Sequence, residues 1–177
     1  MYALVANTLM HSVSGGDFDV IYSAPFAVLG IQTNGMAVTE LRYLPSTVKP
    51  SGPKTSLARE VLRQIECYLD DSEFVFDLPL EVEGSDFRKR VWKEMRDIPA
   101  GKTLTYGEVA QRIGSAPRAV GGACGDNRIP LIIPCHRIVA RDGIGGFMHT
   151  TGNCELGIKR WLLSHERASV SGWSLHT

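Results

Sequence analysis

The residues best suited to chemistry in this sequence are three neighbours, Cys135, His136 and Arg137. They follow the apolar, proline-interrupted segment 129–134, so we expect the Cys135 thiol to be largely buried. Burial in apolar surroundings raises the pKa of a thiol and makes it inert, whereas an adjacent imidazole or guanidinium lowers the pKa and yields a nucleophilic thiolate. Taken alone, these residues leave two interpretations open: a core cysteine or an activated nucleophile.

The segments that lead to this cysteine are predicted to be helical. Ser85 can cap a first helix that ends before Pro99, and residues 105–108 form a Thr-x-x-Glu capping box that begins a second helix. Residues 115–117 open a third helix after a very short turn. Two short helices connected in this way form a helix-turn-helix, which often presents its second helix to DNA. Short helix pairs also occur in purely structural bundles, and this alternative stays open.

The third predicted helix, between residues 117 and 127, has an unusual composition. It contains three glycines, each of which costs roughly 1 kcal/mol of helix propensity relative to alanine. A helix whose exposed face carries only glycine and alanine can approach another surface closely, including the walls of a narrow DNA groove. Close helix packing inside the protein is the alternative interpretation.

The first half of the chain has the pattern of an antiparallel sheet covered by a helix. Residues 26–33 and 36–44 have a β-type composition on either side of Asn34-Gly35, the dipeptide best suited to a tight hairpin turn. Apolar residues then recur at helical spacing and predict a helix over about residues 56–70. An extended connection follows, and we place a domain boundary near residue 84.

We therefore predict an α+β protein of two domains. Residues 1–84 are expected to form an N-terminal antiparallel-sheet domain with one helix. Residues 85–177 are expected to form a mostly helical C-terminal domain that contains the helix-turn-helix and, through it, binds DNA.

Length and composition exclude several classes of protein. The chain has 177 residues, of which 44% are hydrophobic and 21% charged, and it contains no apolar stretch close to the roughly eighteen residues that a membrane span needs. Disordered, collagen-like and membrane proteins are therefore excluded. The first five residues lack the features of a secretory signal, so we expect a cytoplasmic protein whose four cysteines are thiols.

The charges are distributed unevenly between the two halves. Residues 1–84 carry five Lys/Arg and eleven Asp/Glu, a net charge of −6, whereas residues 85–177 carry fourteen and eight, a net charge of +6. Such an asymmetry suggests that the basic half meets a polyanion. A chance distribution of solvated charge is the alternative.

The motifs of the second half occur together at fixed spacing. They comprise residues 101–110, residues 117–123, Asn127 with Pro130, residues 132–139 around Pro134-Cys135-His136-Arg137, and residues 158–166. On these motifs the chain closely resembles the O6-alkylguanine-DNA alkyltransferases, the methylated-DNA–protein-cysteine methyltransferases of direct-reversal DNA repair. The resemblance covers about residues 80–167, and the first part of the chain matches the family only in its layout.

The resemblance implies roles for Cys135 and for three residues near it. Cys135 would accept the alkyl group from O6 of guanine, and also from O4 of thymine. His136 would act as a base through a water molecule, and Glu166 would orient it. Asn127 would tie the turn beneath the active site, although any asparagine after a helix can simply be a C-cap.

The resemblance also implies how double-stranded DNA containing O6-alkylguanine is bound. Arg118 would enter the base stack and fill the space left by an extruded nucleotide, and Tyr106 would push the target phosphate and help to bind the flipped base. The small residues of the same helix would lie in the minor groove. The predicted DNA-binding residues are Tyr106, Arg118, Ala119, Gly121, Gly122 and Ala123.

One segment departs from the family pattern. Residues 148–154 form a longer connection than the Ser-Gly-Gly of many relatives. On the family pattern, Phe147 would form an aromatic wall of the pocket, and the backbone amide of Met148 would reach guanine O6. The cysteines lack metal-site spacing, and no phosphate-binding or dinucleotide motif is present. We therefore expect no metal and no cofactor. We also expect the protein to be a monomer.

Three other functions are alternatives to alkyl transfer. A cysteine hydrolase could use the same Cys-His-Glu set, but the basic helix-turn-helix argues against it. A lesion-binding module without chemistry would lack the acceptor, and Cys135 is present. A transcription factor switched by methylation would ordinarily need a further DNA-binding domain, for which 177 residues leave little room.

Overall fold

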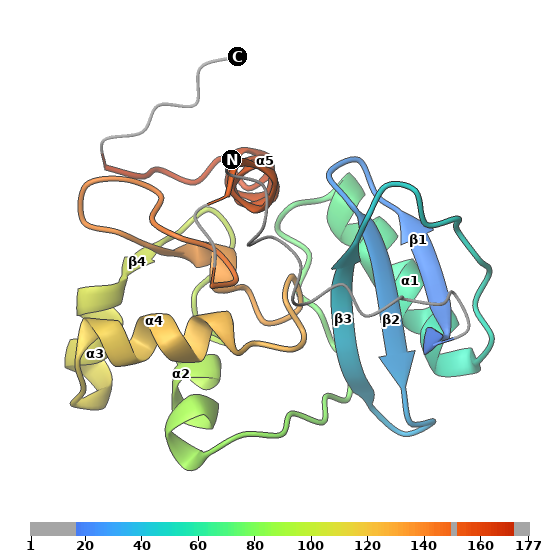
Figure 1. Cartoon of the computed structure of the whole chain (residues 1–177), viewed down its shortest axis with the longest axis horizontal. Helices are drawn as coiled ribbons and strands as arrows, with labels where there is room; N and C mark the ends of the chain where they lie inside the picture. Colours follow the sequence, from blue (N-terminus) through green and yellow to red (C-terminus); the bar gives the residue numbers. More distant parts are fainter. Residues whose placement is uncertain (1–16, 150–151, 172–177) are drawn as a thin grey trace, which may run out of the picture.

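The computed structural model describes residues 17–149 and 152–171, and Figure 1 shows the three-stranded sheet on one side of the molecule with most of the later helices on the other. Three antiparallel strands form the sheet in the order β1-β2-β3: β1 (Val20–Ser23), β2 (Val28–Thr33) and β3 (Val38–Leu44). The predicted hairpin is confirmed: the Asn34 side-chain oxygen accepts from two backbone N–H groups of the turn, and Gly35 has a φ of 88°. Strand β1 was not predicted.

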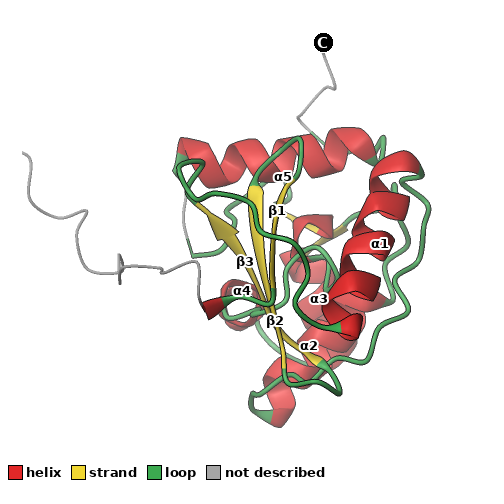
Figure 2. Cartoon of the chain, turned by 90° about the vertical axis from the view of Figure 1, so that its right-hand side faces the viewer, coloured by secondary structure: helices red, strands yellow, loops and turns green. Residues whose placement is uncertain are grey.

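The predicted helix of the first half is also confirmed. Helix α1 (Ser56–Asp70) begins after Thr55, whose side chain accepts from the backbone N–H of Ala58. Its buried face, which includes Val61 and Ile65, packs against the sheet, and Figure 2 shows the helix lying along one side of the strands. The amphipathic pattern alone was sufficient to locate this helix.

The second half is mainly helical, as predicted. Its elements are α2 (Asp86–Arg96), β4 (Leu104–Thr105), α3 (Tyr106–Ile113), α4 (Pro117–Gly125), the 3-10 turn η2 (Cys135–Arg137), β5 (Ile138–Val139) and α5 (Asn153–His165). No helix in the described ranges is long and apolar enough to cross a membrane.

Local capping fixes the helix pair α3 and α4. Ser85 caps α2, and Thr105 and Glu108 form the predicted capping box at the start of α3. Gly114 then ends α3 in the left-handed conformation, with a φ of 65°, which glycine adopts without steric cost. Helix α4 begins three residues later, so the predicted arrangement of two helices around a short turn is confirmed.

Two features place the cysteine turn against the helices. The short strands β4 and β5 pair in parallel, so Thr105 lies beside Val139 and the start of α3 comes close to η2. A single large core cluster then runs from the sheet through α1 and α2 to α5, and it includes Val20, Val91 and Leu162. The hydrophobic core continues across residue 84 and does not divide there. The domain boundary near this residue therefore stays a prediction.

Candidate active site

Cys135 lies at the start of η2, with 4% of its surface exposed, in the wall of a cavity of about 250 Å3. The preceding loop folds back on itself, so the backbone N–H of Cys135 donates to the carbonyl of Ile133 at 2.8 Å. The cavity is lined by Tyr106, Gly121, Cys124, Gly125, Cys135, Gly146, Phe147, Met148 and His149. The predicted acceptor is therefore buried but reachable from this cavity.

Asn127 holds the loop that carries the cysteine. Its side-chain N–H donates to the carbonyl of Ile133 at 2.8 Å, and its side-chain oxygen accepts from the backbone N–H of Ile129 at 3.0 Å. The residue is buried, and the C-cap of α4 is Asp126 instead. The C-cap interpretation of Asn127 is therefore wrong, and the residue lies beneath the cysteine turn.

His136 and Glu166 are in direct contact inside the protein. The two residues are fully buried, and His136 Nε2 lies 2.8 Å from Glu166 Oε1. Arg137 adds further bonds to the same carboxylate, from Nη2 to Oε1 at 2.9 Å and from Nε to Oε2 at 3.0 Å and, more weakly, to Oε1 at 3.3 Å. The other ring nitrogen of His136, Nδ1, is buried and has no partner within the described part of the chain.

Burial and the contacts within this cluster together set its protonation states. Burial raises the pKa of the Cys135 thiol to about 11, against the smaller opposing effects of Asn127 and Lys159. Burial also lowers the pKa of His136, which Glu166 partly opposes. Although burial alone would raise the pKa of Glu166, contact with His136 and Arg137 holds it well below its usual range. At neutral pH the site therefore holds a thiol, a neutral imidazole and a carboxylate.

Tyr106 begins α3 and forms one wall of the cavity. Its hydroxyl donates to the carbonyl of Gly146 at 3.2 Å, and burial raises its pKa, so the phenol stays protonated. A Cβ placed on Gly121 would lie 3.9 Å from the edge of the Tyr106 ring. The absence of a side chain at Gly121 thus keeps this side of the cavity open.

Helix α4 presents most, but not all, of its predicted DNA-binding residues to the surface. Arg118 and Ala119 are exposed, and Gly121 and Gly122 are partly exposed. The prediction is wrong for Ala123, which is 3% exposed. Ala123 lies one turn after the buried Val120, and its carbonyl accepts from Trp92 Nε1 at 2.8 Å, so this face of α4 packs against α2.

Lys159, a fully buried lysine on α5, was not predicted from the sequence. Its Nζ donates to the carbonyls of Ile138 at 2.7 Å and Gly146 at 2.8 Å, and it lies 5.9 Å from the centre of the Tyr106 ring. Burial lowers its pKa to about 8. Its spacing to the buried Leu162 and Leu163 was the signal that could have identified it.

The rim of the cavity contains His149, which was not predicted to have a role. Its Nε2 lies 2.9 Å from Oδ1 of Asp126, which also pairs with Arg88. The ring covers Gly125 so closely that a Cβ there would come within 2.3 Å of it. Phe147 is buried in the cavity wall, as expected, and Met148 beside it is half-buried. Residues 150 and 151 of the longer loop lie outside the described residues.

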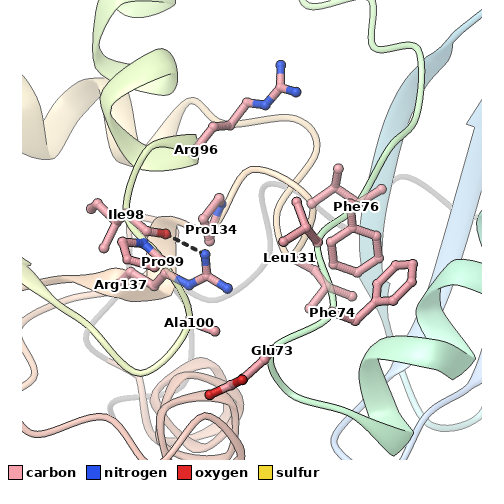
Figure 3. Close-up of a pocket in the computed structure, with 12 residues that line it drawn as sticks. Glu73, Phe74, Phe76, Arg96, Ile98, Pro99, Ala100, Leu131, Pro134 and Arg137 are labelled. Atoms are coloured by element: carbon pink, nitrogen blue, oxygen red, sulfur yellow. Dashed lines mark hydrogen bonds between the residues drawn. The ribbon is translucent and has the colours of Figure 1, made fainter.

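A second cavity, of about 330 Å3, reaches the same cluster from another direction (Figure 3). Arg137 lies in its wall, where Nη1 donates to the carbonyl of Ile98 at 2.6 Å. Phe74 and Phe76 from the first half of the chain face it. This cavity is lined by no thiol or imidazole, so the chemistry belongs to the cavity that contains Cys135.

The structure offers no candidate metal centre within residues 17–149 and 152–171, since no three His, Cys, Asp or Glu side chains gather there. All four cysteines are free thiols. Cys124 shares the cavity with Cys135, but burial raises its pKa further, and it is not followed in the chain by the His–Glu pair that adjoins Cys135. The Cys135 thiol is therefore the better placed nucleophile.

A buried thiol next to a His–Glu pair, on a fold with a helix-turn-helix whose second helix is partly exposed, is the arrangement expected of a DNA-binding protein with a nucleophilic cysteine. Residues 86–168 match the family model described as 6-O-methylguanine DNA methyltransferase, DNA binding domain. The chain is 38% identical over 126 residues to a methylated-DNA–protein-cysteine methyltransferase of Mycobacterium tuberculosis, covering 68% of this chain and 76% of the relative. It therefore belongs to the methylated-DNA–protein-cysteine methyltransferase family.

Other relatives and solved structures agree. A protein of the same name from Methanosarcina barkeri is 47% identical over 115 residues, covering 63% of this chain and 70% of the relative. The crystal structure of Mycobacterium tuberculosis OGT in complex with DNA aligns with a TM-score of 0.70 at 34% identity, covering 84% of this chain and 93% of that one. The two-part α+β fold is thus that of the family.

Proposed function

We propose that this protein removes an alkyl group from O6 of guanine in double-stranded DNA and keeps it on Sγ of Cys135. The observation that carries the proposal is the buried Cys135 thiol, reachable from a cavity and followed by a His136–Glu166 pair at 2.8 Å. In the transfer, a bond forms between Sγ and the alkyl carbon, and the bond between that carbon and O6 breaks. The thiol proton is matched by the proton that guanine regains at N1.

His136 is proposed to move the thiol proton. Because the pKa of Cys135 is raised to about 11, the thiol must be deprotonated as it reacts. The buried Nδ1 of His136 has no protein partner within the described residues, so it is free to accept from a water that bridges to Sγ. Glu166 would hold the ring by Nε2 and stabilise the imidazolium that forms.

The exposed face of α4 is proposed to bind the minor groove. The Arg118 side chain is exposed, as a residue that fills a gap in the base stack must be. Gly121 and Gly122 leave room for the sugar-phosphate walls, and Tyr106 closes the cavity that would take the flipped base. Activity on O4 of thymine, a monomeric state and a cytoplasmic location stay predictions.

The stoichiometry of the reaction tests this proposal against a hydrolase. A thioether has no easily expelled leaving group, so each molecule should react once. With O6-methylguanine duplex in excess, repaired guanine should reach a plateau at the protein concentration. Continued turnover would contradict transfer and support hydrolysis, and binding without any product would support a lesion-binding module.

A further inference from the structure

One polar contact of the Cys-His-Glu cluster comes from the other half of the protein. Tyr68, on α1, donates its hydroxyl hydrogen to Oε1 of Glu166 at 2.9 Å. The two residues are 98 positions apart in the chain. Oε1 is the same atom that lies 2.8 Å from Nε2 of His136, so the phenol and the imidazole share one acceptor.

The phenol is held firmly in place. Tyr68 is 1% exposed, and its ring packs against those of Phe76 and His165, with centroids 5.5 and 5.0 Å apart. His165 Nε2 also lies 2.8 Å from the backbone oxygen of Tyr68. Because His165 directly precedes Glu166, these contacts fix the end of α5 against α1 and aim the Tyr68 hydroxyl at the carboxylate.

We propose that Tyr68 is a positioning residue of the active site: its hydroxyl fixes the orientation of the Glu166 carboxylate toward His136 and shares its negative charge. The first half of the chain, which carries no reacting group, would thereby complete the machinery of the second. This inference rests on the proposed role of His136 as the base.

Glu166 raises the pKa of His136 against the effect of burial, and the groups that bind Glu166 weaken this effect. Glu166 accepts from Tyr68 on α1, from Arg137 on η2 and, at 3.4 Å, from the backbone N–H of Gly101, besides its contact with His136. The charged groups that act on His136 are Glu166, Arg137 and Lys159. Each hydrogen bond to the carboxylate reduces the charge available to an imidazolium. Burial keeps the Tyr68 phenol protonated, so it can only donate here.

The variant Tyr68→Phe removes the hydroxyl and keeps the ring. With one donor fewer on Oε1, we expect the pKa of His136 to rise by about half a unit to one unit. The acid limb of the pH–rate profile for alkyl transfer should shift to higher pH by the same amount. Transfer below that limb should fall up to about tenfold and approach the rate of the unaltered protein at higher pH.

Two measurements on the full chain test this. NMR titration of His136 without substrate gives its pKa directly, and single-turnover transfer from a lesion duplex gives the pH profile. Tyr22→Phe is the matched control, because Tyr22 is a half-buried tyrosine of the same sheet-and-helix region that faces Glu66 and Asp70 and not Glu166. It should change neither quantity.

An unchanged His136 pKa in Tyr68→Phe would overturn the inference, as would a rate loss of equal size at every pH, which indicates a packing defect. A shift of pKa and acid limb together would support it. The titration needs no substrate, so it remains decisive for Tyr68 if Cys135 proves not to accept an alkyl group, which would overturn only the proposed function.

Discussion

The two halves of the molecule share a core but differ in the polar groups that they bury. In residues 17–84, the buried polar side chains are Glu40 and Gln64, and in the remaining described residues they are Asn127, His136, Lys159 and Glu166. Burying a polar group is costly unless it is hydrogen-bonded. The residues of the second group lie around Cys135, where Asn127 holds its loop and Glu166 contacts His136, whereas Gln64 bonds the backbone of Asp77. The concentration of buried polarity thus marks the half that reacts.

The sharpest test of this comparison replaces one buried polar residue in each half. His136→Gln should slow alkyl transfer by about 10²- to 10⁴-fold, the usual contribution of a general base, while binding of lesion DNA is retained. Single-turnover rates and a DNA-binding titration measure both properties.

Gln64→Leu is the counterpart in the first half. It should lower the free energy of unfolding by about 1–3 kcal/mol, because the polar groups of Asp77 lose their partner, and should leave the transfer rate unchanged. If His136→Gln transfers at the normal rate, or Gln64→Leu alone loses activity, the comparison fails.

Arg118→Ala should have the next largest effect, and only on duplex DNA. If Arg118 fills the gap in the stack, repair of a paired lesion should slow by about 10- to 100-fold, since flipping costs a few kcal/mol. The reaction with free O6-benzylguanine needs no flipping and should keep its rate. Equal losses on both substrates would contradict the assignment, and Arg112→Ala, an exposed arginine on α3, is the control for charge alone.

The uneven charge predicts a smaller effect in salt titrations of DNA binding. Affinity should fall steeply with salt, and Arg112→Ala should lower the slope of log K against log salt concentration by about one if the helix pair meets phosphates. Lys49→Ala, an exposed change in the acidic half, should leave the slope unaltered. A reduced slope for Lys49→Ala alone would place the DNA on the acidic first half and contradict the prediction.

The smallest effect is expected at the end of α4. Gly122→Ala meets nothing within 4 Å and should stabilise the fold by up to about 1 kcal/mol through helix propensity. Gly125→Ala should gain less than Gly122→Ala, because its Cβ would displace His149 and break the contact with Asp126. Chemical denaturation of both variants measures the difference, and an equal gain would show that His149 moves aside without cost.

Much of this fold could be predicted from local patterns. The Asn34-Gly35 turn, the amphipathic α1 and the capping box of α3 each depend on neighbours within a few residues, and each was located correctly. Strand β1 was missed because four residues carry too little periodicity to identify a strand.

The site was predictable only in part, because its remaining contacts join distant segments. Cys135 and His136 are adjacent in sequence, but Lys159 and Tyr68 reach the cluster only through tertiary packing. Ala123 was assigned to the DNA-binding face because the helix is rich in glycine and alanine. Its spacing of three residues from the buried Val120 indicated instead that it faces the core. His149 lies in a loop with positive φ angles, which no local pattern in the sequence specified.

The central claim is that Cys135 itself receives the alkyl group. After incubation with an O6-methylguanine duplex, the intact protein should gain the mass of one methyl group in place of one hydrogen. Peptide mapping should then find the methyl group on Cys135, with Cys67, Cys124 and Cys154 unmodified. Loss of the methyl group from DNA without a gain of mass by the protein, or a methyl group on another cysteine, would contradict the account.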